Sequence, residues 1–116
     1  MTKKSIPAEV FTGSSTGKVR KVHGTLFSLT GTRIQEKATA LACVVSKKVA
    51  SKAVDRNRIK RWCREAARQH ARSLEVSYAM VFRAKKDAAS ATHADIEREI
   101  GTLVEKWKDT VYNASQ

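Results

Sequence analysis

Residues 41–45, Leu-Ala-Cys-Val-Val, constrain the fold more than any other part of the sequence. In a strand, successive side chains point to opposite faces of the sheet, and here the residues for both faces are apolar. A short run of this kind is typical of a strand buried in the middle of a sheet. We expect that strand to span residues 38–46. Two further strands are predicted at 77–84 and at 21–30, where the turn signal Thr30-Gly31-Thr32 ends the strand. The chain should therefore fold around a small central sheet.

Two helices are predicted as well, at residues 56–72 and 93–112. Asp55 is the expected N-cap of the first, and Thr92 with Asp95 resembles a capping box before the second. The order strand, strand, helix, strand, helix predicts an α+β fold, a compact α-β sandwich with helices packed on one sheet. The 116 residues suit a single domain, 1–116, in which 1–20 is largely loop with room for a short helix.

The predicted helix at 56–72 separates apolar from basic residues. On a helical wheel, one arc carries Ile59, Trp62, Cys63 and Ala66, which should face the sheet. The opposite arc carries Arg56, Asn57, Lys60, Arg61, Arg64, Arg68 and Arg72, with Arg58 at its edge. Solvated helix faces usually mix charges, because like charges one turn apart repel. A stripe with one nearby acid, Glu65, therefore favours a polyanionic partner over a merely solvated face.

Basic loops extend this stripe. Ser46-Lys47-Lys48 and Lys52 lie between the buried strand and the helix, and Lys85-Lys86 follows Arg83 at the end of the last strand. For Arg83, an ordinary surface residue and a nucleic-acid contact are equally good interpretations. The formal net charge of +12 agrees with a polyanion.

Nucleic acid and an anionic membrane are the two polyanionic surfaces to weigh. No apolar run approaches the roughly 20 residues that a membrane span needs, and the basic N-terminus lacks the apolar segment of a signal peptide. Cys43 and Cys63 are isolated, without metal-ligand spacing, and we expect both as buried, reduced thiols. These features predict a cytoplasmic nucleic-acid-binding protein without a membrane partner.

Catalytic signatures are missing from the sequence. It contains no phosphate-cradling glycine loop, no paired carboxylates and no metal spacing among His23, His70 and His93. His70 falls on the apolar side of its helix and is expected in the core. We therefore predict no catalytic residue, no metal site and no small-molecule substrate.

The segment from Ser46-Lys47-Lys48 to Arg56-Asn57-Arg58-Ile59-Lys60-Arg61, continued by Arg64-Glu65, resembles the bacterial ribonuclease P protein component. That family has a strand ending in Ser-Lys-Lys, a short loop and this basic motif on a helix. The resemblance covers roughly residues 38–111. It implies a left-handed strand-helix-strand crossover, whereas the general rule predicts a right-handed one.

The resemblance also implies partners and site residues. The family binds a catalytic RNA and the 5′ leader of precursor tRNA, and the RNA cleaves with Mg²⁺ that it holds itself. Carried over by motif or neighbourhood, the RNA-binding residues are Ser46, Lys47, Lys48, Lys52, Arg56, Asn57, Arg58, Lys60, Arg61, Arg64 and Arg68. The leader cleft of the family is lined by aromatics. Phe11 is the candidate for one of these, and Phe27 and Arg83 are the candidates for the floor of the cleft. Phe27 has a competing interpretation as a core residue.

Three other functions compete with this one. A ribosomal or general RNA-binding protein fits the charge equally well and is disfavoured by the motif alone. A DNA-binding helix lacks a turn and a first helix before residue 56. A self-contained nuclease lacks clustered acids to hold metal ions.

Overall fold

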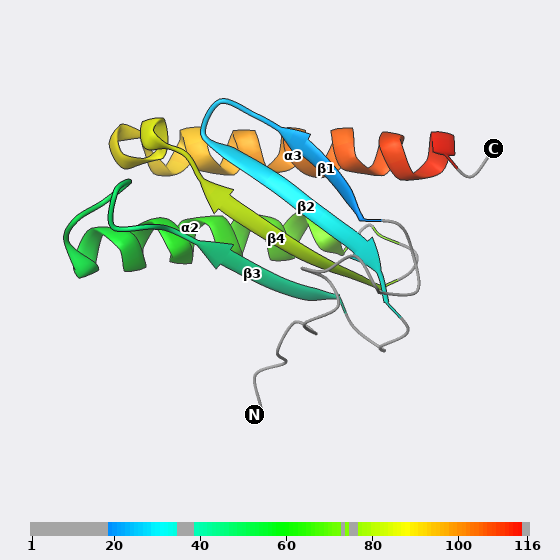
Figure 1. Ribbon diagram of the computed structural model, residues 1–116, viewed down its shortest axis with the longest axis horizontal. Helices are drawn as coiled ribbons and strands as arrows, with labels where there is room; N and C mark the ends of the chain where they lie inside the picture. The colour runs from blue at the N-terminus through cyan, green and yellow to red at the C-terminus, as the bar shows by residue number, and fades with distance from the viewer. Residues whose placement is uncertain (1–18, 35–38, 73, 75–76, 115–116) are drawn as a thin grey trace.

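The computed structural model describes residues 19–34, 39–72, 74 and 77–114 (Figure 1). This part of the chain has the predicted mixed α+β architecture. Its elements in chain order are β1 (Arg20–His23), β2 (Phe27–Arg33), β3 (Ala40–Val44), α2 (Ala53–Ala71), β4 (Tyr78–Ala84), the short 3-10 helix η1 (Lys86–Ser90) and α3 (His93–Ala114). Both α-helices lie on one face of the sheet, which makes a two-layer sandwich.

The sheet has the strand order β1-β2-β4-β3. β2 is antiparallel to both β1 and β4, whereas β3 and β4 are parallel neighbours. The helix α2 between β3 and β4 is therefore a crossover connection. In Figure 1 both strands run to the left, α2 returns behind them and β4 lies above β3, so the crossover is left-handed. The family resemblance implied this hand, against the general rule.

The single strand predicted at 21–30 is wrong, because the chain forms a hairpin there. The chain turns at Gly24, whose N–H donates to the carbonyl of Phe27 at 2.8 Å. The turn is fixed to α3 by the carboxylate of Glu99, which accepts the N–H groups of Leu26 at 2.5 Å and of Phe27 at 2.9 Å. β1 and β2 are consequently two short antiparallel strands.

Trp107 of α3 lies at the centre of the core and is fully buried. Its ring packs over Gly31, where an added Cβ would be 2.8 Å from the ring. The ring meets Tyr78 edge-on, with centroids 4.6 Å apart, and its N–H donates to the carbonyl of Arg20 at 3.2 Å. Because Gly31 is needed for this contact and not for a turn, β2 continues past the predicted end to Arg33.

The rest of the main core joins the same face of the sheet to both helices. Its largest fully buried members besides Trp107 are Phe27, Leu29, Ile59, Met80, Phe82, Ile96, Ile100, Leu103 and Val104.

The start of α2 differs from the prediction. The helix begins at Ala53, and Lys52 occupies the N-cap position without a side-chain hydrogen bond. Asp55 is instead in the first turn, where its carboxylate pairs with Arg58 at 3.3 Å. A negative charge in the first turn interacts favourably with the positive end of the helix dipole, so Asp55 helps the helix start without capping it.

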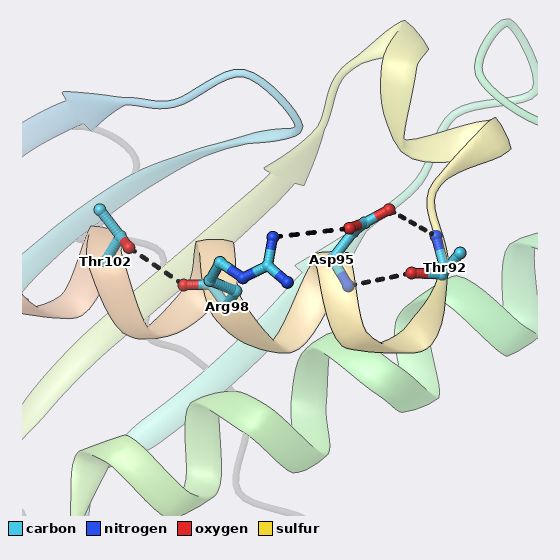
Figure 2. Close-up of polar contacts among 4 residues, drawn as sticks. All are labelled: Thr92, Asp95, Arg98 and Thr102. Atoms are coloured by element: carbon cyan, nitrogen blue, oxygen red, sulfur yellow. Dashed lines mark hydrogen bonds and ion pairs between the residues drawn. The ribbon is translucent and has the colours of Figure 1, made fainter.

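The predicted capping box of α3 is confirmed (Figure 2). The N–H of Asp95 donates to the hydroxyl of Thr92 at 3.1 Å, and the N–H of Thr92 donates to the carboxylate of Asp95 at 3.2 Å. The carboxylate also faces the guanidinium of Arg98 at 3.7 Å. The hydrogen bonds from the Thr92 backbone and hydroxyl, with help from Arg98, hold the pKa of Asp95 below its usual value.

Thr92→Ala should lower the free energy of unfolding by about 1 kcal/mol, because the Asp95 N–H loses its cap. Thr92→Ser keeps the hydroxyl and is the matched control. Urea unfolding of both variants measures the difference. Equal stability of the alanine and serine variants would show that the hydroxyl contributes nothing.

Cys43 and Cys63 are both free and buried, as predicted. The sequence did not indicate that they meet. Strand β3 and helix α2 bring the two sulfurs to 2.9 Å, with the Cys43 thiol donating to Cys63. Burial, reinforced by this contact with Cys43, raises the pKa of the Cys63 thiol far above its usual value. Cys63 therefore stays protonated in the folded protein.

This raised pKa predicts a loss of stability in alkaline solution. Above about pH 8.5 an unfolded-chain thiol ionises while Cys63 in the folded protein does not, so each further pH unit favours unfolding by up to about 1.4 kcal/mol. Below that pH the contribution is fully present. Urea unfolding at pH 7.5 and pH 10 should show a smaller loss for Cys63→Ala than for the wild type. The same pH dependence in both proteins would rule out this origin.

Candidate nucleic-acid interface

Helix α2 presents one polar side and one buried side. Ile59, Cys63, Ala66 and Ala67 are buried against the sheet and the rest of the core, which confirms the predicted apolar arc. Trp62 belongs to that arc but is only half-buried. The side turned away from the core, called the basic face below, consists of Asn57, Lys60, Arg61, Arg64 and Arg68. Three of these are exposed, whereas Lys60 and Arg64 are half-buried.

Arg56 has a different position from the one that the helical wheel predicts. It is half-buried, and one guanidinium nitrogen, Nη1, donates to the carbonyls of Ala50 at 3.0 Å and Ser51 at 2.8 Å. These carbonyls belong to the loop before α2, which folds back over the start of the helix. Arg56 thus holds the loop in place, and its RNA contact stays a prediction.

The loop between β3 and α2 displays the predicted lysines. The carbonyl of Ser46 accepts the N–H groups of Val49 at 3.1 Å and Ala50 at 3.2 Å, which closes a tight turn. Ala50 is buried and anchors the turn, whereas Lys47 and Lys48 are exposed at its tip. Lys52 is also exposed, directly before α2. This loop lies at the same end of the molecule as the start of α2, at the left in Figure 1.

The face of the sheet opposite the helices carries a second group of exposed polar and basic side chains. Residues paired across neighbouring strands lie on the same face. The register pairs His23 with Ser28, Ser28 with Arg83, and Arg83 with Val44, which places them in one row across all four strands. His23 and Arg83 are exposed, and Lys21 is exposed on the same face one pair further along. Sequence reasoning missed Lys21 and His23, which only the strand register reveals.

Phe27 is not on this face. It is fully buried in the core beneath the helices, so its interpretation as a leader-contacting aromatic is wrong and the core alternative holds. The physical reason is the hairpin turn, which sets Phe27 and Leu29 toward the helices and Ser28 on the opposite face of the sheet, where it is also buried. Phe11 lies outside the described residues. Of the three leader candidates, Arg83 alone has a described side chain at the surface.

The charges are unevenly distributed. Acidic residues of the described chain gather on α3, which carries Asp95, Glu97, Glu99, Glu105 and Asp109. Helix α2 carries Asp55 and Glu65 as its acids, against six arginines and lysines. The positive field is therefore concentrated on α2 and the loop before it, where closely spaced phosphates would be neutralised.

The described residues bring no three His, Cys, Asp or Glu side chains together as a metal site. None of the described helices is long and apolar enough to cross a bilayer.

Comparison with known proteins agrees with this geometry. The model of the Ribonuclease P family matches residues 14–108. The chain belongs to the ribonuclease P protein family. It is 37% identical over 98 residues to the ribonuclease P protein component of Desulfosudis oleivorans, a match that covers 84% of this chain and 76% of the relative.

Solved structures of RNase P proteins share the fold. A Staphylococcus aureus RNase P protein mutant with defective mRNA degradation activity superposes with a TM-score of 0.72 at 25% identity, covering 86% of this chain and 80% of that one. The RNase P protein of Thermotoga maritima gives a TM-score of 0.69 at 19% identity, over 84% and 86% of the two chains.

Proposed function

We propose that this protein is the protein subunit of ribonuclease P, which removes the 5′ leader of precursor tRNA in the cytoplasm. In this role the chain supplies binding surfaces and the catalytic RNA supplies the hydrolysis, with Mg²⁺ held mainly by RNA. The observation that carries the proposal is the basic face of α2 beside the Lys47-Lys48 loop, inside a chain of the RNase P protein family.

The basic face is the proposed contact with the catalytic RNA. Arg61 and Arg68 are exposed, and their planar guanidinium groups suit bidentate contacts to phosphate. Lys47, Lys48 and Lys52 extend the surface beyond the start of the helix. Neutralising phosphates in this way lets a folded RNA and its substrate approach each other. It also makes the affinity fall steeply as salt rises.

The opposite face of the sheet is the proposed contact with the leader. Lys21 and Arg83 provide positive charges there, and His23 adds an exposed ring with hydrogen-bonding nitrogens. The buried Ser28 lies between His23 and Arg83 in the strand register. Contacts to phosphate and sugar carry little sequence information, which suits a leader of variable sequence.

The bound RNA itself tests this proposal against a general RNA-binding role. The tagged protein, purified from its own cells at low salt, should retain one structured RNA and precursor tRNA. A ribosomal protein would retain ribosomal RNA instead. Recovery of ribosomal RNA as the main species would overturn the proposal.

A further inference from the structure

Helices α2 and α3 run side by side in the same direction and begin at the same end of the molecule (Figure 1). Trp62 of α2 meets His93, the first residue of α3. About two turns further along both helices, His70 meets Gly101. At Gly101 an added Cβ would be 2.7 Å from the His70 ring, so the helices are in close contact there. At the Trp62 end the contact is made by two rings near the surface.

These rings form a stack with a cation beside it. The ring centroids of Trp62 and His93 are 5.1 Å apart and their planes differ by 22°. The guanidinium carbon of Arg58 lies 5.4 Å from the centroid of Trp62. Trp62 is half-buried, whereas His93 is exposed although one side of its ring is against Trp62. The open surface of the imidazole is therefore the side turned away from the tryptophan.

The stack is continuous with the basic face. Arg58 lies one turn before Trp62 and three residues before Arg61, so an RNA that covers Arg61 reaches Arg58 and the stack next. RNA-binding proteins commonly take unpaired bases on aromatic rings and on arginine planes, because every base has a π face. A folded RNA offers such bases in its loops and bulges.

We propose that Arg58, Trp62 and His93 form a stacking site for one unpaired base of the RNA that the basic face binds. The base stacks on the open side of His93 and extends the column that begins at Trp62. This inference rests on the proposed RNA-binding function. It adds a contact that recognises an unpaired base, whereas the basic face contacts phosphate groups.

The test compares three substitutions of His93 in binding to the cognate catalytic RNA, measured by fluorescence anisotropy. His93→Ala should weaken binding by about 5- to 100-fold, the range for loss of one base–aromatic stack. His93→Tyr restores a flat ring and should restore most of the affinity. His93→Lys supplies a charge without a ring and should not. Thr102→Ala, an exposed position on α3 away from the stack, is the matched control and should bind like the wild type.

A second readout separates stacking from helix packing. Binding of the RNA should change the fluorescence of Trp62, because the ring of His93 that stacks on it is held by the base. Trp62→Phe should remove this part of the signal change. The melting temperature of each variant reports packing independently. Full affinity of His93→Ala, or rescue by lysine but not by tyrosine, would overturn the stacking site while leaving the proposed function intact. Failure of the wild type to bind the RNA would overturn both.

Discussion

Replacing Arg61, Arg64 and Arg68 together with alanine should lower the affinity for the catalytic RNA on the order of a thousandfold near physiological salt. Each guanidinium is proposed to make a charge-assisted contact to phosphate, and such a contact is worth about 1.5–3 kcal/mol, with some loss of additivity between neighbours. The slope of log affinity against log salt should become less negative by about two to three, because each lost phosphate contact removes about 0.7–0.9. Fluorescence anisotropy across a salt series measures both quantities.

A variant of equal net charge is the control for this experiment. Arg98, Lys106 and Lys108 lie on α3, so their replacement by alanine removes three positive charges from outside the basic face. This second triple variant should bind with nearly wild-type affinity and salt slope. Equal weakening by the two triple variants would mean that net charge, and not the position of the arginines on α2, governs binding.

Trp107→Ala should be the most destabilising single substitution in the core, with a loss of about 3–5 kcal/mol of unfolding free energy. The ring is fully buried, packs over Gly31 and against Tyr78, and has its N–H hydrogen-bonded. Domains of this size are stable by about 5–15 kcal/mol, so the variant should be partly unfolded at moderate urea concentrations. Urea unfolding followed by circular dichroism measures the loss.

Trp62→Ala provides the comparison for Trp107. Trp62 is half-buried, so its replacement should cost less than the range expected for a fully buried tryptophan. A loss for Trp62→Ala equal to or above that for Trp107→Ala would contradict the assignment of Trp107 as the centre of the core.

The helices were predictable from the sequence because burial follows their period of 3.6 residues. Ile59, Cys63 and Ala66 are buried where the wheel places them, and the Thr92–Asp95 box marks the start of α3. Arg56 departs from the wheel because its partners, the carbonyls of the preceding loop, are set by how that loop folds back. A helical wheel contains no information about the loop.

The strands were less predictable, because a turn inside an apolar stretch changes which residues face inward. The chain turns at Gly24, between Val22 and Phe27. The alternation of an uninterrupted strand at 21–30 does not settle which face of the sheet Phe27 lies on, and the hairpin places it in the core. The meeting of Cys43 with Cys63 depends on tertiary packing of β3 against α2, which neither residue's local sequence indicates. The row of His23 and Arg83 likewise exists only through pairing across strands.

Cleavage of precursor tRNA at low Mg²⁺ tests the central claim most directly. The protein alone should cleave nothing, and the cognate catalytic RNA alone should cleave slowly at a limiting Mg²⁺ concentration. Adding the wild-type protein should accelerate cleavage by that RNA, whereas the variant lacking Arg61, Arg64 and Arg68 should require a much higher protein concentration for the same rate. A protein that fails to improve cleavage by the RNA at any Mg²⁺ concentration would contradict the proposed function.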